Sequence, residues 1–279
     1  MQFLDTPIEQ HFFSGRTLYV KREDLCAPPP MPPLSKARGI GAHLLNLREK
    51  QGVRRVGVLD TKVSKSGLAV AILAEELGLG CDYFFPAPKG EEWRLPHREE
   101  AERHGATLCP LPGGRIAVAY GRARAQEPGH MLPLGFPLFE TVTETAAVVE
   151  GMQIQGEVEG LLLAVGTGTI LAGVVIGLAR RGGWQLPVFG VTASMDVAKA
   201  ERRCQGHFER AVAEGLVDMA ALNSVRLQMR LYKWGEDYYA PEQVNAPWPC
   251  HPYYEGKALA WLQQEASAPE RLLFYNIGA

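Results

Sequence analysis

The chain has 279 residues, 46% of them apolar, which predicts one or two domains with a sizeable buried core. Its 29 lysine and arginine residues nearly balance 31 aspartates and glutamates, giving a net charge of −2. We therefore expect no nucleic-acid or membrane partner, since both normally require a basic excess. Five widely spaced cysteines, with no signal peptide at the start, argue against a disulfide framework and predict a cytoplasmic protein.

Short apolar runs alternate with helical patterns from residue 56 onward. Residues 56–59 form a predicted buried strand, and residues 66–77 form the helix after it, which ends at Gly78. Further strands are predicted at 82–85, 107–109, 131–134, 160–165, 188–191 and 271–275. Further helices are predicted at 92–104, 115–125, 140–151, 170–180, 198–214 and 256–265. This alternation predicts parallel strands joined by helical crossovers, hence an α/β fold.

Two segments break this pattern. Residues 27–33 (APPPMPP) predict a stiff loop, because proline fits neither a helix interior nor a central strand. Residues 223–249 are less periodic and rich in aromatic residues and prolines. We therefore predict no regular element in the first segment and assign none to the second.

An uncharged run, residues 161–179, is long enough to span a membrane. It also contains Gly173 and Gly177, which are spaced as in helix-dimer motifs of membrane proteins. However, the Gly-Thr-Gly-Thr sequence in its middle weakens a continuous helix. A buried strand, a glycine turn and a buried helix explain the run better.

The glycine turn at residues 166–169 (GTGT) lies between a predicted strand and a predicted helix. Glycines allow the backbone to approach an anion, and the free amides and dipole of a helix start attract one. We therefore expect Gly166, Thr167, Gly168 and Thr169 to bind a phosphate group. Two alternatives stay open: a plain tight turn, and a dinucleotide-binding loop, whose glycine spacing this segment matches imperfectly.

Lys36 follows the proline-rich loop, at a point where Ser35 is predicted to cap a helix. A lysine in the first turn of a helix feels the positive end of the dipole, which favours its neutral amine. The neutral amine is the form that makes a Schiff base. The alternative is a solvated surface lysine, the commoner environment for this residue type.

Two other loops could contact a ligand. Residues 61–67 (TKVSKSG) open a predicted helix, with the hydroxyls of Ser64 and Ser66 and with amides that could bind a carboxylate. Tyr254 and Glu255 bring a phenol and a carboxylate to the start of another predicted helix. Each segment could also be ordinary helix capping or dipole matching.

Two further groups of residues are assigned no chemistry. Cys204 with His207, and Cys250 with His251, are poorly arranged for zinc. Six arginines alternate with acidic residues and therefore predict solvated helix faces. They are Arg94, Arg98, Arg103, Arg115, Arg122 and Arg124.

The order of these segments resembles the fold-type II pyridoxal-phosphate enzymes of the tryptophan-synthase-β-like superfamily. The likeness covers residues 17–279 and is strongest to the group of 1-aminocyclopropane-1-carboxylate deaminase and D-cysteine desulfhydrase. It rests on residues 18–25 (LYVKREDL), the segment around Lys36, the serine loop, the GTGT loop and residues 254–258 (YEGKA). The resemblance implies pyridoxal 5′-phosphate as the cofactor. It also implies an α/β fold of two lobes, with parallel sheets flanked by helices.

The resemblance also assigns roles to individual residues. Lys36 falls on the Schiff-base lysine, and Ser64 on the serine that holds the substrate carboxylate. Tyr254 falls on the tyrosine that faces the substrate, and Glu255 on the glutamate that contacts the pyridine nitrogen. These four form the predicted catalytic set. The predicted cofactor-binding residues are Lys36, Lys65, Gly166, Thr167, Gly168, Thr169, Ile170 and Glu255.

The chain departs from the family pattern in several of these loops. Lys65 replaces the asparagine that touches the ring hydroxyl of the cofactor, and Ile170 replaces the threonine that ends the phosphate loop. Residues 33–35 (PLS) stand for Gly-Gly-Asn, and residues 277–279 (IGA) stand for Thr-Gly-Gly. The departures favour cofactor binding over the standard reaction of the group.

By this resemblance, residues 1–44 and 137–279 form a large cofactor-binding lobe, and residues 45–136 form a small α/β lobe. The cofactor is expected in the cleft between them, at the carboxyl ends of the strands. A homodimer is the expected assembly.

We predict a pyridoxal-phosphate-dependent lyase or deaminase that acts on a small amino acid through a Cα carbanion. Lys36 is then the base near Cα, and Glu255 keeps the ring nitrogen protonated. One alternative is a decarboxylase or other lyase for an unusual amine carried on a larger molecule, with Lys65 holding an anion. The others are a non-catalytic relative of the fold and a nucleotide-dependent oxidoreductase of a different fold.

Overall fold

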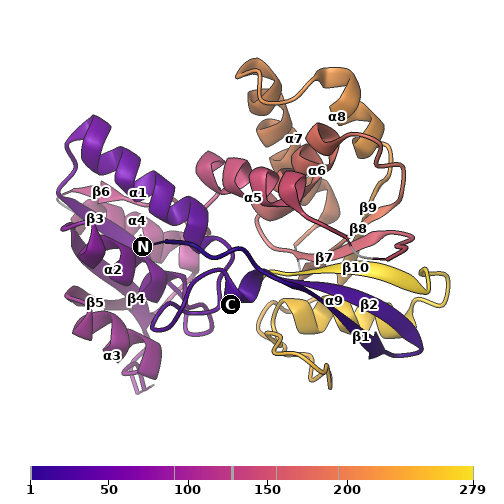
Figure 1. Ribbon diagram of the computed structural model, residues 1–279. Coiled ribbons are helices and arrows are strands. Elements are labelled where there is room, and N and C mark those ends of the chain that lie inside the picture. Colours follow the sequence, from indigo (N-terminus) through magenta and orange to yellow (C-terminus); the bar gives the residue numbers. More distant parts are fainter. Residues whose placement is uncertain (1, 91, 127–128, 155, 194, 279) are drawn as a thin grey trace.

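Two β-sheets flanked by helices form two lobes in the computed structural model, which describes residues 2–90, 92–126, 129–154, 156–193 and 195–278 (Figure 1). The larger sheet has the strand order β1-β2-β10-β7-β8-β9. All its neighbouring strands are parallel except the antiparallel pair β1–β2. The strands are β1 (Ile8–Phe13), β2 (Arg16–Arg22), β7 (Leu161–Val165), β8 (Val188–Ala193), β9 (Met229–Trp234) and β10 (Arg271–Asn276).

The smaller sheet is parallel throughout, in the order β5-β4-β3-β6. Its strands are β3 (Arg55–Leu59), β4 (Gly80–Ala87), β5 (Ala106–Pro112) and β6 (His130–Met131). The predicted α/β fold with two lobes and parallel sheets is therefore confirmed. All four strands fall within residues 45–136, and the expected boundary before residue 45 lies inside helix α1 (Ala37–Gln51).

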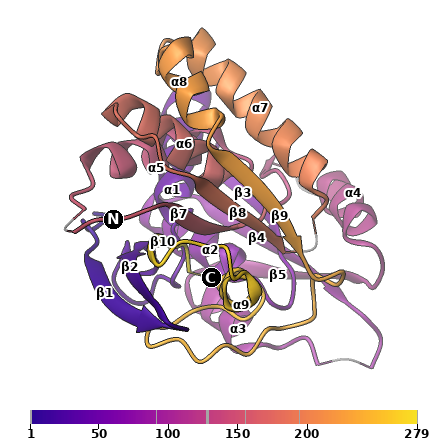
Figure 2. The same ribbon diagram turned by 90° about the vertical axis from the view of Figure 1, so that its right-hand side faces the viewer.

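Helices cover both faces of the larger sheet, with α9 on one face and α5 to α8 on the other (Figures 1 and 2). In the smaller lobe α2, α3 and α4 contact the sheet, and α1 and α3 pack against α2. The remaining helices are η1 (Glu23–Leu25, a 3₁₀ turn), α2 (Ser66–Glu76), α3 (Pro96–Arg103), α4 (Ile116–Gln126), α5 (Phe139–Gly151), α6 (Thr169–Arg181), α7 (Val197–Ala213), α8 (Met219–Arg226) and α9 (Glu255–Gln264).

The uncharged run 161–179 forms β7, a glycine turn and most of α6, as the sequence predicts. Its two spaced glycines serve helix packing inside the fold. A Cβ on Gly173 would lie 2.5 Å from Thr145 Cβ, and one on Gly177 would lie 2.6 Å from the carbonyl oxygen of Ala146, both on α5. Within the described ranges, the helices lack the combination of length and apolarity that crossing a membrane requires.

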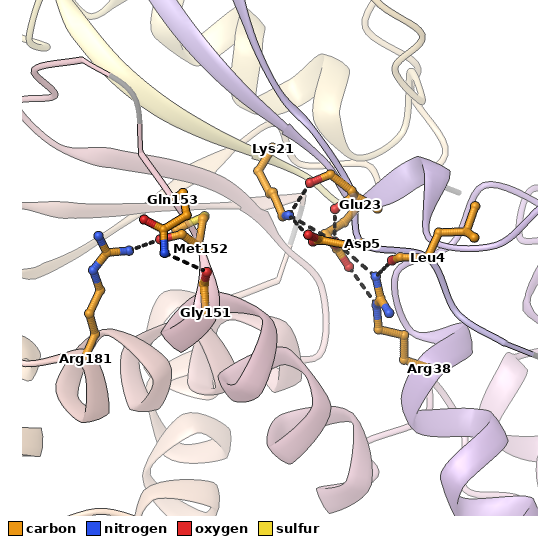
Figure 3. A network of polar contacts seen from close by, with 10 residues as sticks. Leu4, Asp5, Lys21, Glu23, Arg38, Gly151, Met152, Gln153 and Arg181 are labelled. Carbon is orange, nitrogen blue, oxygen red and sulfur yellow. Dashed lines mark hydrogen bonds and ion pairs between the residues drawn. The ribbon is translucent and has the colours of Figure 1, made fainter.

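A cluster of buried charges fastens the N-terminal segment and α1 to β2 (Figure 3). The carboxylate of Glu23 is 1% exposed and accepts a hydrogen bond from Arg38 Nε at 3.1 Å and another from the Thr6 hydroxyl. Lys21 Nζ lies 3.9 Å from Glu23 Oε1. Burial lowers the pKa of Lys21, and its acidic neighbours oppose that shift. We call Thr6, Lys21, Glu23 and Arg38 the Glu23 cluster.

The structure adds regular elements that the sequence pattern did not reveal. Strand β9 and the end of α8 lie in the segment 223–249, to which we assigned nothing. β1 is likewise unpredicted; it is a half-exposed edge strand whose residues lack an apolar run. Helix α3 begins at Pro96 rather than at residue 92, because proline is accepted at the first helical position.

Candidate active site

Lys36 lies between the lobes, directly before α1, where two cavities meet. Its Nζ donates hydrogen bonds to the carbonyl oxygen of Gly135 at 3.0 Å and to Thr167 Oγ1 at 3.3 Å. The inner cavity, of about 60 Å³, is lined from Leu34 to Lys36, from Ala164 to Gly168, and by Ser64, Ser66, Ile170, Leu171, Tyr254, Ile277 and Gly278. The wide cavity, of about 500 Å³, shares several of these residues and adds Asp60, Thr61, Gly135, Lys199 and Tyr238 among others.

Burial prepares the Lys36 amine for covalent chemistry. Burial and, to a smaller extent, the positive charge of Arg203 together lower the pKa of Lys36 to about 8. The sequence argument also favoured a neutral amine, but it relied on the helix dipole. The expected cap of α1 by Ser35 is wrong, because Lys36 itself occupies the cap position and no side chain caps the helix. Instead, the Ser35 amide donates to the carbonyl oxygen of Ile277 at 2.8 Å.

The GTGT loop connects β7 to α6 and forms one wall of the inner cavity. Gly168 has φ +85°, in the left-handed region that favours glycine, and a Cβ there would lie 3.0 Å from Cys204 Sγ. Gly166, Thr167, Gly168 and Ile170 all line the cavity, whereas Thr169 is fully buried and its hydroxyl lies 2.9 Å from that of Thr167. The first amides of α6 have no partner within the helix, so this loop can hold a phosphate.

Glu255 lies buried at the start of α9 with one oxygen unpaired. Its Oε2 accepts a hydrogen bond from the His251 amide at 3.2 Å, whereas Oε1 has no hydrogen-bond partner among the described residues. Burial raises the pKa of Glu255 to about 7. A buried, unpaired carboxylate oxygen is costly unless a ligand supplies a donor. The protonated ring nitrogen of pyridoxal phosphate is such a donor.

Tyr254 precedes Glu255 and lines both cavities. Its hydroxyl is in contact with the hydroxyl of Tyr238. Burial raises the pKa of Tyr254 far above its ordinary value and that of Tyr238 to about 12, so both phenols stay protonated at neutral pH. The pair can therefore donate or relay a proton at the edge of the wide cavity.

The serine loop before α2 brings two hydroxyls to both cavities. Ser64 Oγ donates to Ser66 Oγ at 3.1 Å and accepts from the Ser66 amide at 3.2 Å. Both serines line the inner and the wide cavity. Lys65, between them, is half-buried and lines neither cavity. The structure thus gathers Lys36, Ser64, Tyr254 and the GTGT loop in one place, with Glu255 buried beside them, and leaves Lys65 outside the cavity walls.

Two residues that line the wide cavity were not found from the sequence, and a third residue, outside it, was placed wrongly. Asp60 follows β3 directly and lines the wide cavity, and its position at the carboxyl end of a parallel strand was the available signal. Tyr238 lies in the aperiodic segment, which gave none. Arg98 corrects an expectation: it is 1% exposed instead of lying on a solvated helix face. Its guanidinium carbon lies 4.1 Å from the centre of the Phe85 ring.

The sequence matches the pyridoxal-phosphate dependent enzyme family over residues 2–242. The chain belongs to this family. Its cofactor is therefore pyridoxal phosphate, and the resemblance noted from the sequence is confirmed. The Lys36 amine and the GTGT loop, which line the inner cavity, fit the aldehyde and the phosphate of that cofactor. Glu255 lines neither cavity, but its unpaired Oε1, next to the lining residue Tyr254, fits the ring nitrogen.

Similar proteins include enzymes of several reaction types. A glycyl-dTMP PLP-dependent decarboxylase of Pseudomonas phage M6 is 31% identical over 98% of both chains. A solved ACC deaminase homologue superposes with a TM-score of 0.77 at 18% identity, covering 99% of this chain and 89% of the other. Serine racemase from Dictyostelium discoideum gives 0.62 at 16% identity, covering 99% and 92%. The solved structures support the shared fold, and their reactions differ.

Proposed function

We propose that this protein is a pyridoxal-phosphate-dependent decarboxylase whose substrate is an amino acid unit carried on a nucleotide. The observation that supports this most strongly is the 31% identity, over nearly the whole length of both chains, to a decarboxylase named for glycyl-dTMP. The structural likeness to deaminases and racemases lies below 20% identity and supports the fold without choosing a reaction. Deamination or elimination from a small amino acid stays as the competing prediction.

The size of the wide cavity supports a substrate larger than a free amino acid. The inner cavity, beside the GTGT loop, has a volume of about 60 Å³. The wide cavity, which Lys36 also lines, measures about 500 Å³, within the range typical of pockets for drug-sized ligands. The cofactor would take up part of this space, and a small amino acid beside it would still leave room for a carried group.

The reaction we propose breaks the bond between Cα and the carboxylate carbon. Carbon dioxide leaves, and Cα takes up a proton, so that the amino acid unit becomes an amine. Pyridoxal phosphate, when bound, accepts the electron pair that this bond releases. The chemistry needs a free amino group and a carboxylate on the same carbon, so the glycyl unit must be attached to its nucleotide through Cα.

The chain's own residues cover the remaining tasks. Lys36 would hold the cofactor, and its amine, with a pKa lowered to about 8, can deliver the proton to Cα. Ser64 and Ser66, at the start of α2, can orient the carboxylate before it is lost. Glu255 would keep the ring nitrogen protonated, since an anion stabilises a neighbouring cation.

The test is to incubate the holoenzyme with a thymidylate that carries a Cα-linked glycyl group. We expect carbon dioxide and the corresponding amine, measured by gas trapping and mass spectrometry, with no ammonia. 1-Aminocyclopropane-1-carboxylate and D-cysteine are the comparison substrates, and we expect no turnover of either. Ammonia release from these amino acids, with the glycyl nucleotide left intact, would establish the deaminase and reject the decarboxylase.

A further inference from the structure

A third cavity, which we call the outer cavity, opens next to the wide cavity on the small lobe. It has a volume of about 470 Å³, and Thr61 lines both cavities. Its walls come from the loop after β3, the end of β4, the approach to α3, the start of α4 and the loop after β9. The Tyr238 and Tyr239 rings, 5.0 Å apart, also connect the two spaces, because Tyr238 lines the wide cavity and Tyr239 the outer one.

Positive charge dominates the walls of the outer cavity. Lys62, Arg98 and Arg115 line it from three different segments, against the single acidic residue Glu92. Lys62 and Arg115 are exposed, whereas Arg98 is 1% exposed. Cations brought together from separate segments repel one another and gain stability when an anion binds between them.

Arg98 is buried with part of its hydrogen-bonding capacity unused. Its Nη1 donates to the carbonyl oxygen of Trp93 at 2.8 Å, and its Nε has no hydrogen-bond partner in the described ranges. The Tyr83 hydroxyl is a further hydrogen-bond partner, and the Asp60 carboxylate, which accepts a hydrogen bond from that hydroxyl, acts on Arg98 without forming an ion pair with it in the described ranges. A buried guanidinium normally pairs with an anion, and its planar donors match a phosphate group especially well.

Tyr239 gives the outer cavity an aromatic surface. Its side chain is 45% exposed, although the residue lines the cavity. The other ring, Trp93, is already engaged, because it stacks on Phe85 at 5.4 Å and Arg94 lies 5.2 Å from its centre. Tyr239 is therefore the ring on which a planar base can stack.

We propose that the outer cavity binds the phosphate-bearing nucleoside part of the substrate, with Lys62, Arg98 and Arg115 facing the phosphate and Tyr239 the base. This inference rests on the proposed function and extends it by giving the nucleotide its own binding site. The wide cavity then holds the amino acid unit beside Lys36, and the nucleotide reaches the outer cavity past Thr61. The shared chemistry is a thymidine phosphate, either free or within a DNA strand.

Binding to the holoenzyme tests the site without any turnover. Calorimetry with dTMP should show binding, and thymidine without phosphate should bind at least about tenfold more weakly. Arg115→Gln and Lys62→Gln, both at exposed positions, should each weaken dTMP binding severalfold, and Arg98→Lys should weaken it most. Tyr239→Ala should weaken it about tenfold, whereas Tyr239→Phe should not. Arg124→Gln, an exposed change on helix α4, which Arg115 directly precedes, is the matched control.

A short single-stranded oligothymidylate separates the two sources of the phosphate. Tighter binding of the oligonucleotide than of dTMP, with the same dependence on Arg115, indicates a DNA strand as substrate. Binding of dTMP alone indicates the free nucleotide. Equal binding of thymidine and dTMP, or unchanged dTMP affinity in Arg98→Lys, Arg115→Gln and Lys62→Gln, would overturn the proposal.

The outcomes also separate this site from the proposed function. If dTMP binds with the expected dependence on Arg115 and Tyr239 but no carbon dioxide is released, the nucleotide site stands and the decarboxylase fails. If the glycyl nucleotide is decarboxylated and its KM is unchanged in Arg98→Lys and Arg115→Gln, the decarboxylase stands and the nucleotide site fails.

Discussion

Two buried glutamates of this protein have opposite surroundings. Glu23 is surrounded by the Thr6 hydroxyl, the Arg38 guanidinium and the Lys21 amine, so both of its oxygens are engaged (Figure 3). Glu255 is 0% exposed, yet only one of its oxygens accepts a hydrogen bond, from the His251 amide. The first carboxylate is satisfied by the protein itself. The second is left with a free oxygen beside the residues that would hold the cofactor.

This difference indicates that the Glu23 carboxylate stabilises the fold, whereas the Glu255 carboxylate is available to bind a ligand. Removing a buried group whose partners are all in the protein leaves those partners uncompensated and destabilises the fold. Removing a group whose partner is a ligand leaves the fold intact and affects binding or chemistry. Substitutions at the two glutamates, and at Lys36, should therefore fall into two distinct classes.

The largest effect is expected at Lys36. Lys36→Ala removes the amine that would hold the cofactor and move the proton, so turnover should fall by about 10³-fold or more, with little change in stability. Borohydride reduction and peptide mapping should place the cofactor label on Lys36 in the wild type. A label on Lys65 or Lys257 would reject the assignment. We do not expect it on Lys257, because Lys257 Nζ donates a hydrogen bond to the carbonyl oxygen of Asp237 at 2.7 Å.

Glu23→Ala tests the structural class. It leaves Arg38 and Lys21 buried without their common carboxylate, which should lower the free energy of unfolding by about 3–5 kcal/mol. Urea denaturation measures this change, and turnover per folded molecule should stay near the wild-type value. Glu157→Gln, which removes an exposed partner of Arg271, is the control and should shift the urea midpoint very little. A stable Glu23→Ala variant would show that the Glu23 cluster contributes little to the fold.

Glu255→Gln tests the ligand class. The amide keeps the size and hydrogen bonding of the side chain but loses its charge, so cofactor binding should persist while turnover falls by about 10²-fold. Urea denaturation of the apoprotein should show no loss of stability, in contrast to Glu23→Ala. Steady-state kinetics with Glu270→Gln, an exposed substitution near β10, serve as the control. Normal turnover in Glu255→Gln would place the partner of the ring nitrogen elsewhere.

A smaller effect of Glu255 should appear in how the free energy of unfolding of the apoprotein depends on pH. Its folded pKa of about 7 lies above its ordinary value of 4.5, so the folded state binds more protons than the unfolded state between these values. Its stabilising contribution is thus present at low pH and is lost as the pH rises through 7. Relative to Glu255→Gln, wild-type stability should fall by about 2 kcal/mol from about pH 5 to about pH 7.

The comparison with the variant is necessary because His251 titrates in the opposite sense. Burial lowers the pKa of His251 from 6.5 to about 4, so its effect on stability rises with pH over that interval. Urea unfolding of both apoproteins at several pH values cancels this common contribution. Parallel pH profiles for wild type and Glu255→Gln would contradict a raised pKa at Glu255.

The parts of the fold that could be predicted are those that depend on patterns of neighbouring residues in the sequence. Strand, glycine turn and helix at residues 161–181 are adjacent in the sequence, so their apolar runs and turn residues sufficed. The pairing of β10 with both β2 and β7 was out of reach, because it joins segments more than a hundred residues apart. Strand β9 was missed because its residues are mostly half-exposed and lack a buried apolar run.

The same limit applies to the site. The composition of the GTGT loop by itself indicates a phosphate site. The roles of Lys36 and Glu255 could be predicted only from the order of the segments that contain them. Arg98 was assigned to a solvated face because charges alternate around it, and no sequence pattern reveals the Phe85 ring that covers it. Its burial depends on which strand α3 packs near, a property of the tertiary structure.

The position of β10 has a consequence for the order in which the protein can fold. This strand lies between β2 and β7 in the larger sheet, although it comes after both in the chain. During synthesis, the segments that carry Lys36 and the GTGT loop emerge long before the strand that joins their sheet. Because β10 lies between β2 and β7, the larger sheet beside the cofactor pocket is complete only after residue 276 has been made. Closing so long a loop is also slow.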